Sequence, residues 1–456
     1  MIHTDRRNLP PGPRGFPIVG VLPRVWQNPL QYLLDAACQY GDVVQLRPGP
    51  SRVYLLSHPD DIKYVLQDNA RNYRKSLRIK RIRPLFGNGL TTSEGESWRR
   101  QRRLMQPAFQ PQRLAPWVAV MSELTATMLE RWRPLAACGH FLDIAAEMSA
   151  LTQRMVGATL LRTDLGSEVK TVSRAMAVVE EELNRRVWAM LDVPLWIPTL
   201  RNRRLRRALC TLEQVVYRLW AAHHGHGDDT GDLLSMLMKA RDPRTGQAMD
   251  ETQWRDEVLT LLFAGHETTA AALAWTWALL AQHPHVQARL HQEVVAVLGG
   301  RTPTSTDLPN LPYTKRVIEE ALRLYPPTWI TARTPLEDDE IGGYAIPAGS
   351  VVLLSSYVMH RHPRFWEAPT VFDPERFTPA RAVDRPRYAY FPFGGGPRQC
   401  LGKHFALQEA QLIVAMVAQR YRLQLVPGHP IIPQPLLALR PRDGVRVMLH
   451  PYITHQ

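Results

Sequence analysis

The stretch 256–283, DEVLTLLFAGHETTAAALAWTWALLAQH, constrains the fold of this 456-residue chain more than any other feature. Its length and composition predict one long helix that is apolar on nearly all sides, and such a helix is stable only when other elements cover it. Helical patterns dominate from about residue 59 to residue 330 and can supply that cover. A polar group, HETT, interrupts the apolar run, and a buried polar group needs hydrogen-bonding partners or a functional reason.

Strand patterns are confined to the two flanks of this helical region. VVQLRP at 43–48 and SRVYLLS at 51–57 predict short strands on the N-terminal side. Residues 341–354 alternate turn residues with β-branched runs, and LALRPRDGVRVML at 437–449 predicts a further strand pair.

The chain shows no sign of being divided by a linker. Proline and glycine crowd residues 9–23, so the first 25 residues are predicted to form a proline-rich extended segment before a first helix near 28–40. No repeat of fixed period and no long Gly/Ser stretch separates two folding units. We therefore predict a single domain over 1–456, mainly α with small flanking β-sheets.

The net charge limits the classes of possible binding partner but says nothing about the fold. The 56 Lys and Arg outnumber the 42 Asp and Glu by 14, which suits an acidic protein, a membrane surface or nucleic acid. The basic clusters at 74–83 and 201–209 come with no recognised nucleic-acid module, so nucleic acid is not expected. The apolar stretch before the second cluster, which contains Trp196, could touch a membrane surface or cover a substrate channel.

Four cysteines are scattered too widely for a disulfide framework or a structural zinc site, which favours the reducing cytoplasm. They are Cys38, Cys138, Cys210 and Cys400. The N-terminus lacks both the apolar core of a signal peptide and the roughly 20 apolar residues of a membrane span. We expect a soluble protein without a transmembrane anchor.

One cysteine lies in an unusual setting, FPFGGGPRQCLG at 391–402. A lone loop cysteine is ordinarily a small buried side chain without chemistry. Here, however, a glycine-rich turn presents Cys400 just before a helical pattern, where backbone N–H groups and a helix N-terminus can stabilise a thiolate. The segment resembles the haem-binding signature of the cytochrome P-450 superfamily, and Phe393, Gly396, Arg398, Cys400 and Gly402 fill every fixed position.

This resemblance implies the cytochrome P-450 fold, a haem b cofactor and monooxygenase activity. Cys400 would be the axial thiolate ligand of the haem iron, whose electron donation favours cleavage of dioxygen. Phe393 would pack beside it, and Arg398 would pair with a haem propionate. A solvated loop arginine is the alternative for Arg398.

The polar group of the long apolar helix resembles the distal-helix motif of the same family. Ala264 and Gly265 would leave room for dioxygen, while Glu267 and Thr268 would form an acid–alcohol pair that delivers protons to it. The structural alternative is that the threonine hydroxyls bond back to preceding carbonyls and Glu267 pairs with a neighbouring cation.

Two further groups of residues fit the family in the expected order along the chain. Glu320 and Arg323, three residues apart on a predicted helix, with Arg376 in PERF at 374–377, resemble the family's structural Glu-Arg-Arg triad. Trp98 and Arg102 in WRRQRRLMQPAF, and Arg333 in TWITARTP, are the predicted propionate partners, with a solvated basic face as the alternative.

Both electrons are expected from a separate ferredoxin- or flavodoxin-type protein, and ultimately from NAD(P)H, because nothing that looks like a reductase follows Gln456. Arg99, Arg100 and Arg103, on the same predicted helix as Arg102, are the hypothesised docking surface for that acidic partner. The protein is expected to be a monomer.

The substrate is expected to be a hydrophobic small molecule such as a fatty acid, terpenoid, steroid or polyketide-like compound. The predicted lining comprises 74–92, 187–200, Ala264, Gly265, Trp329, Ile330 and 431–437 with Leu436. An oxidase of the same fold that couples, desaturates or rearranges its substrate stays an alternative, and a non-enzymatic haem sensor is a more distant one.

Overall fold

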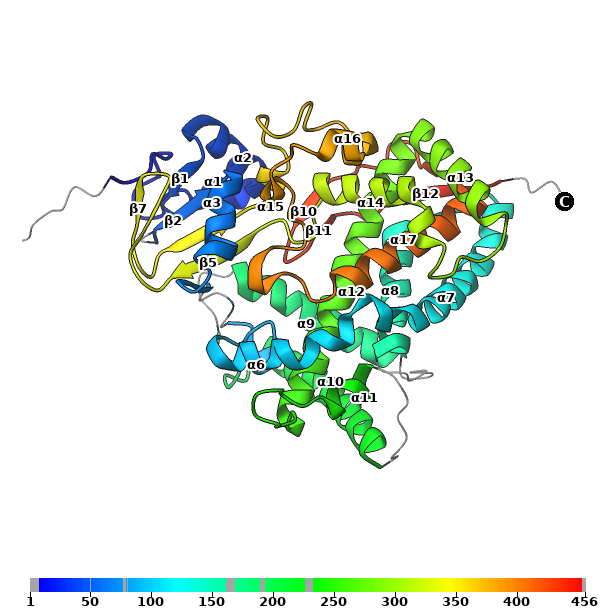
Figure 1. Ribbon diagram of the computed structural model, residues 1–456, viewed down its shortest axis with the longest axis horizontal. Helices are drawn as coiled ribbons and strands as arrows, with labels where there is room; N and C mark the ends of the chain where they lie inside the picture. Colours follow the sequence, from blue (N-terminus) through cyan, green and yellow to red (C-terminus); the bar gives the residue numbers. More distant parts are fainter. Residues whose placement is uncertain are drawn as a thin grey trace, which may run out of the picture. The chain divides into compact units, whose positions relative to one another are not determined.

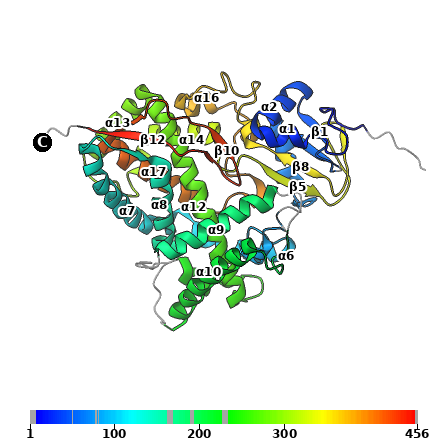
Figure 2. The ribbon, with the colours of Figure 1, turned by 180° about the vertical axis from the view of Figure 1, so that it is seen from behind.

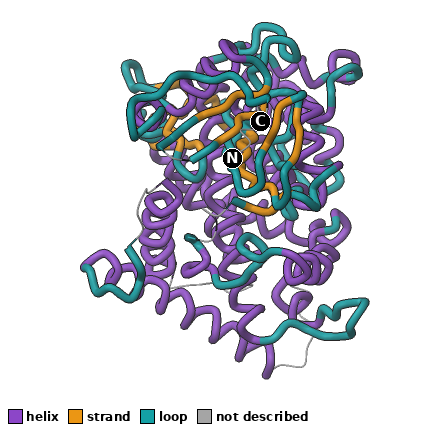
Figure 3. The backbone as a smooth tube through the Cα atoms, turned by 90° about the vertical axis from the view of Figure 1, so that its left-hand side faces the viewer, coloured by secondary structure: helices purple, strands orange, loops and turns teal. Residues whose placement is uncertain are grey.

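The computed structural model describes residues 8–49, 51–76, 79, 81–160, 169–188, 193–225 and 233–452. The chain divides into two compact units, each built from two separate stretches of sequence. Unit 1 comprises 1–77 and 319–400, and unit 2 comprises 78–318 and 401–456. Helices account for most of the backbone trace, as Figure 3 shows. The mainly α architecture predicted from the sequence is confirmed.

Unit 1 is organised around a five-stranded sheet of order β1-β2-β8-β5-β3 (Figure 1). Its strands are β1 (Val43–Leu46), β2 (Val53–Leu56), β8 (Val351–Leu354), β5 (Thr331–Pro335) and β3 (Tyr73–Lys75). The central pair β2 and β8 is parallel, with Val53 opposite Val351, whereas the other pairs are antiparallel. Every residue of β1 and β2 is buried, including the polar Gln45, as expected for strands covered on both faces.

A glycine turn joins the two strands of a separate hairpin in unit 1. Strands β6 (Asp339–Ile341) and β7 (Tyr344–Ile346) are linked by Gly342 and Gly343, whose φ angles are 59° and 79°. A two-residue hairpin turn needs positive φ at both positions, which glycine adopts without strain.

The remaining elements of unit 1 are short, apart from one helix that also enters unit 2. They are α1 (Leu22–Gln27), α2 (Pro29–Tyr40), α3 (Pro59–Lys63), η1 (Tyr64–Asp68), the end of α14 (Pro312–Leu324), α15 (Ser356–Met359), η5 (Pro374–Phe377), α16 (Pro379–Ala382), η6 (Arg387–Ala389) and η7 (Gly396–Arg398). The predicted first helix corresponds to α2, whose N-cap Asn28 accepts a hydrogen bond from the Gln31 N–H. The expectation of an extended segment up to that point was wrong at its end, because α1 begins at Leu22 with a proline in its first turn.

Unit 2 contains the long helices of the protein together with several short ones. Its helices are α5 (Arg83–Phe86), α6 (Gly95–Met105), η2 (Gln106–Phe109), α7 (Pro111–Ala137), α8 (Ile144–Leu160), α9 (Val169–Trp188), α10 (Leu200–Gly225), α11 (Leu233–Lys239), α12 (Glu251–Gln282), α13 (Pro284–Leu298), η4 (Leu308–Asn310), the start of α14 and α17 (Lys403–Arg420). Helix α12 is the predicted apolar helix, and its N-cap Asp250 accepts from the Gln253 N–H at 2.8 Å. It packs against α8, α10 and α17, so other helices supply the cover that its apolar surface requires.

Short strands complete unit 2. They are β4 (Phe141–Asp143), β9 (Tyr421–Leu425), β10 (Pro433–Pro435), β11 (Leu439–Pro441) and β12 (Arg446–Pro451). The two predicted C-terminal strands do not pair with each other: β11 pairs with β10, and β12 lies between β4 and β9. The carbonyl of Leu439 on β11 accepts from the Trp275 indole N–H of α12 at 2.9 Å, which anchors the strand to the long helix.

Two carboxylates near the start of α12 fix the segment that precedes α6. Asp256 accepts from the backbone N–H of Asn88 at 2.6 Å, and Glu257 accepts from that of Leu90 at 2.8 Å. A Cβ atom on Gly89 would lie 2.3 Å from the Thr260 hydroxyl, so the approach requires glycine. None of the helices in the described part of the chain is both long and apolar enough to cross a membrane.

Candidate functional site

The segment that carries Cys400 forms a closed loop in unit 1. The Cys400 N–H donates to the Phe393 carbonyl and the Gly394 N–H donates to the Phe391 carbonyl, both at 2.9 Å. The Gln399 N–H closes a further turn on the Gly396 carbonyl at 3.1 Å. The Cys400 residue at the end of this loop is exposed. The backbone therefore holds the residue in a defined turn with its side chain accessible.

Two glycines allow this loop to pack closely on its neighbours. Gly396 has a φ of 63°, and a Cβ atom there would lie 1.9 Å from the Leu66 carbonyl oxygen. A Cβ atom on Gly395 would lie 2.3 Å from the ring of Tyr388. Both positions therefore require glycine for steric reasons, and Gly396 also requires it for its left-handed backbone.

The structure brings Glu320, Arg323 and Arg376 together in a buried cluster. Arg323 donates two hydrogen bonds of 2.7 Å to the two oxygens of Glu320, a bidentate geometry. The Arg376 Nε lies 3.3 Å from Glu320 Oε1, and all three side chains are at most 5% exposed. The guanidinium groups also donate to backbone carbonyls, Arg323 to those of residues 360, 369 and 371 and Arg376 to those of 367 and 368.

His360 links this cluster to the cysteine loop, and the sequence analysis missed it. Its Nδ1 lies 3.2 Å from the Arg323 carbonyl, and its Nε2 accepts from the Phe391 N–H at 3.0 Å. The ring is therefore neutral, with its proton on Nδ1. Burial, with a smaller contribution from Arg323, holds the pKa of His360 well below 6.5. Its sequence context, HRHPR, contains two histidines and two arginines and gave no signal that His360 is buried.

In unit 2, Thr268 of α12 forms a hydrogen bond back to a preceding carbonyl of its own helix, as expected if its role were only structural. The Thr268 hydroxyl donates to the Ala264 carbonyl at 2.9 Å. Its oxygen still has lone pairs that can accept a hydrogen bond. Ala264 is exposed, and Gly265 and Thr268 are half-buried, so this face of the helix is open.

A purely structural role would also pair Glu267 with a neighbouring cation, and no such ion pair forms among the described residues. Its Oε1 is buried and receives no hydrogen bond from any residue in the described ranges. Burial, and secondarily the charge of Glu180, raises the pKa of Glu267 to about 7, against opposing effects of Arg440 and His266. A carboxyl with this pKa can both hold and release a proton near neutral pH.

A second buried acid lies beside the same part of α12 and was not predicted. Glu409 of α17 is fully buried, neither of its carboxyl oxygens has a hydrogen-bond partner among the described residues, and burial raises its pKa well above 4.5 against a smaller opposing effect of Thr269. Burial therefore favours the protonated form of Glu409. The spacing of nine residues after Cys400 carries no periodic signal from which this burial could be inferred.

The predicted propionate partners lie on ordered elements of both units. Trp98 and Arg102 are half-buried and one helical turn apart on α6 in unit 2. Arg333 lies on β5 in unit 1, where its Nη1 donates to the Thr331 hydroxyl at 3.1 Å and the Ala332 carbonyl at 3.0 Å. Arg398 ends the short turn η7 in the cysteine loop.

The basic face predicted on α6 is smaller than expected. Arg103 pairs with Asp242 at 3.0 Å, and Arg100 donates to Gln253 at 2.7 Å and to the Ala248 carbonyl at 2.5 Å. The side chains of Arg100 and Arg103 are therefore bound to residues of the same chain. Of the three arginines, Arg99 is exposed and contacts Glu96 at 3.4 Å.

The predicted substrate-lining residues differ in accessibility. Trp329 is 1% exposed, which places it in the interior of unit 1 and speaks against a lining role, whereas Ile330 and Leu436 are half-buried. Residues 77, 78 and 80 of the predicted 74–92 lining, and residues 189–192 of the predicted 187–200 lining, lie outside the described residues.

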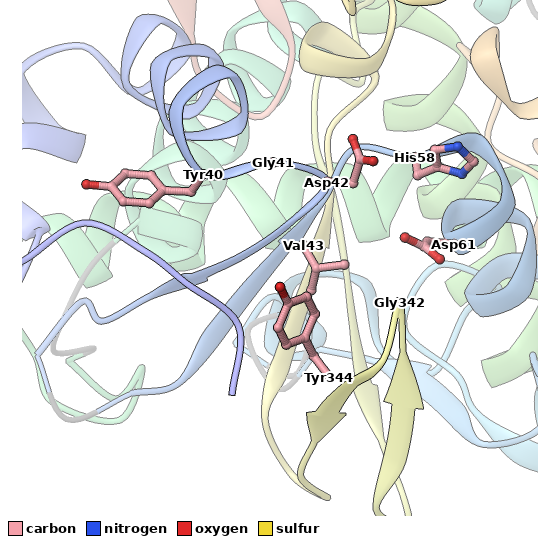
Figure 4. Close-up of a pocket in the computed structure, with 8 residues that line it drawn as sticks. All are labelled: Tyr40, Gly41, Asp42, Val43, His58, Asp61, Gly342 and Tyr344. Atoms are coloured by element: carbon pink, nitrogen blue, oxygen red, sulfur yellow. The ribbon is translucent and has the colours of Figure 1, made fainter. Parts of the chain in front are cut away.

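A surface pocket of unit 1 is unrelated to these residues. It has a volume of about 380 Å³, and Figure 4 shows its lining, which comprises Tyr40, Gly41, Asp42, Val43, His58, Asp61, Gly342 and Tyr344. Asp42 is already paired with Arg364 and lies 3.4 Å from His362. None of the predicted site residues lines this pocket, so it is not the candidate active site.

The family model for cytochrome P450 matches residues 10–447 of the chain. The chain belongs to the cytochrome P450 family. It is 40% identical over 419 residues to cyclooctat-9-en-7-ol 5-monooxygenase of Streptomyces melanosporofaciens, with 91% of this chain and 90% of that relative covered. It is 34% identical over 449 residues to pentalenene oxygenase of Streptomyces avermitilis, with 98% of each covered. A crystal structure of the cytochrome P450DA heme domain superimposes with a TM-score of 0.89, 27% identity and 98% coverage of both chains.

These matches confirm the predicted family, fold and enzyme class: the protein is a cytochrome P450 monooxygenase that acts on a hydrophobic small molecule. Haem is the cofactor that the family implies. The residues present fit a haem. The cysteine loop offers one exposed thiol, and Arg398, Arg333 and Arg102 are donors suited to carboxylates.

Replacing Gly396 tests whether close packing of the loop is needed to retain the cofactor. Gly396→Ala should lower the melting temperature and the ratio of haem to protein absorbance, because the new Cβ atom meets the Leu66 carbonyl. Gly394→Ala is the matched control, since Gly394 has a φ of 66° but no heavy atom within 4 Å of its Cβ position. Equal haem content in the two variants would contradict the steric explanation.

Proposed function

We propose that this cytochrome P450 hydroxylates a polycyclic terpenoid hydrocarbon or alcohol, with Cys400 as the haem-iron ligand and with Glu267 and Thr268 as the proton-delivery pair. The observation that carries the proposal is a buried carboxyl without a hydrogen-bond partner among the described residues, Glu267, next to a hydroxyl on an open face of α12.

The residues that would hold the haem are those of the cysteine loop and the predicted propionate partners. The Cys400 thiolate would bind the iron, Phe393 would pack beside it, and Arg398, Arg333, Arg102 and the Trp98 indole would donate to the propionates. When bound, the haem binds and activates dioxygen, helped by electron donation from the thiolate. The loop hydrogen bonds and the glycine packing hold Cys400 in place for that contact.

Proton delivery needs a group that changes its protonation state near neutral pH and a hydroxyl that passes the proton on. The Glu267 carboxyl, with a pKa of about 7, meets the first requirement. Thr268 meets the second, because its hydroxyl can exchange its bond to the Ala264 carbonyl for one to an acceptor on the open side of the helix.

The proposed substrate class rests on the apolar character of the site and on two relatives. The open face of α12 presents Ala264 and Gly265, which are small and uncharged. The two relatives are named for an unsaturated cyclic alcohol and for pentalenene, and together they support a rigid terpenoid over the fatty acid, steroid and polyketide alternatives.

We propose that electrons come from NAD(P)H through a separate ferredoxin- or flavodoxin-type protein, and that the enzyme is a cytoplasmic monomer. The net charge of +14 favours association with an acidic carrier. Arg99 is the α6 arginine best placed for it, since Arg100 and Arg103 are engaged within the chain.

Turnover under labelled dioxygen tests the proposed reaction. With a redox partner system and a cyclic terpene alkene or alcohol, the product should carry one labelled oxygen atom in a new hydroxyl group. A dehydrogenated or coupled product without label would instead favour the oxidase alternative. Faster labelled hydroxylation of fatty acids than of any cyclic terpene would contradict the proposed substrate class.

Removing the Thr268 hydroxyl tests its role in proton delivery. Thr268→Ala should lower the yield of product per dioxygen consumed by roughly tenfold or more, in line with the usual contribution of a positioned proton-transfer group. Dioxygen consumption should continue and appear as hydrogen peroxide or water.

Thr276→Ala is the matched control for this variant. Thr276 lies on the same helix, and its hydroxyl donates to the carbonyl four residues earlier, Ala272, at 2.8 Å, yet it is buried away from the open face. If both variants lose coupling equally, the loss reflects helix stability and the proposed role of Thr268 is wrong.

A further inference from the structure

A buried pair of ionisable side chains joins α9 to α12 one residue before Glu267. Glu180 Oε1 lies 3.2 Å from His266 Nδ1, and the two side chains are 15% and 7% exposed. On the other edge of the ring, Nε2 lies 3.1 Å from both the hydroxyl and the carbonyl oxygen of Ser149 on α8. Figure 2 shows α8, α9 and α12 in the same part of unit 2. Three helices therefore hold this imidazole.

The imidazole of His266 is held from both edges. Nδ1 faces the Glu180 carboxylate, and Nε2 either donates to the Ser149 carbonyl or accepts from the Ser149 hydroxyl.

This pair acts electrostatically on the carboxyl of Glu267. Three charged or titratable groups contribute to the pKa of that carboxyl: Glu180 on α9, Arg440 on β11 and His266 on its own helix. Glu180 raises the pKa of Glu267, whereas Arg440 and His266 lower it. Because Glu267 Oε1 is buried without a hydrogen bond from any described residue, no direct partner competes with these effects.

We propose that Glu180 and His266 form a positioning pair that sets the pH range over which Glu267 carries its proton, and thereby the pH range of coupled turnover. The inference rests on the proposed function, in which Glu267 delivers protons. If so, Glu180 on α9 influences a reaction whose proton-delivery residues, Glu267 and Thr268, lie on α12. The alternative is that the pair only ties the two helices together.

The sign of the effect follows from the charges. A carboxyl must be protonated to donate, so the product formed per dioxygen consumed should fall as pH rises through the pKa of Glu267, which is about 7. Glu180→Gln removes a negative charge while keeping an amide that can hydrogen-bond to His266, so the fall should move to lower pH by roughly one unit. His266→Gln removes the imidazole that lowers the pKa of Glu267, so the fall should move to higher pH.

The experiment measures the product formed per dioxygen consumed against pH for both variants, the wild type and Glu181→Gln. Glu181 is the neighbouring carboxylate on α9, but its side chain is 56% exposed and contacts Arg204 at 3.3 Å, so its removal should leave the profile in place. Shifts in opposite directions for Glu180→Gln and His266→Gln would support the proposal, because a purely structural tie predicts the same loss for both. Unchanged profiles, or equal shifts in Glu180→Gln and Glu181→Gln, would overturn it.

A Glu267→Gln variant separates this inference from the proposed function. If Glu267→Gln abolishes the pH-dependent fall and Glu180→Gln leaves the fall at its wild-type position, only the positioning role is wrong. If Glu267→Gln retains the wild-type profile, the proton-delivery role of Glu267 is itself wrong. A normal reduced carbon monoxide spectrum in each variant establishes that the haem site is intact before the comparison is made.

Discussion

The buried ion pair between Glu320 and Arg323 is the interaction on which the ordered part of unit 1 depends. Burying a carboxylate and a guanidinium is costly unless each is fully paired, and removing one partner of such a pair typically costs about 3–5 kcal/mol. Here Glu320 pairs with both Arg323 and Arg376. Arg323 also donates hydrogen bonds to three backbone carbonyls. The charges are thus stabilised by the same contacts that fix the backbone from 360 to 376. His360 extends this order to Phe391, where the cysteine loop begins.

Helix α12 meets a different constraint in unit 2, because it must stay buried while carrying polar groups. Most of them are satisfied locally: Thr268 and Thr276 bond back along the helix, and Asp256 and Glu257 bind backbone N–H groups of the segment before α6. Among the described residues, Glu267 Oε1 has no hydrogen-bond partner, and neither do the Trp254 and Trp277 indole nitrogens or the Thr260 hydroxyl of the same helix. An unsatisfied buried carboxyl is unfavourable for stability, which is physically reasonable where that carboxyl must exchange protons.

The sequence predicted those features whose physical signal is local. The length and apolar composition of α12, the short flanking strands and the spacing of Glu320 and Arg323 on one helix face all lie within a few turns of chain. His360, Glu409 and Glu180 could not be found in this way, because their burial and partners depend on elements far apart in sequence. For the same reason, the sequence did not show that residues 242–253 engage Arg100 and Arg103 of the hypothesised docking surface, or that Trp329 packs in the interior.

The most direct test of the account is the reduced, carbon monoxide-bound absorption spectrum of the purified protein beside that of Cys400→Ser. The wild type should show the strongly red-shifted Soret band that a thiolate-ligated haem gives, and Cys400→Ser should lose it. Cys138→Ser, at another exposed cysteine, is the matched control and should keep the wild-type band. An unshifted band in well-folded wild-type protein, or a red-shifted band that survives in Cys400→Ser, would contradict the assignment of Cys400 and the mechanism built on it.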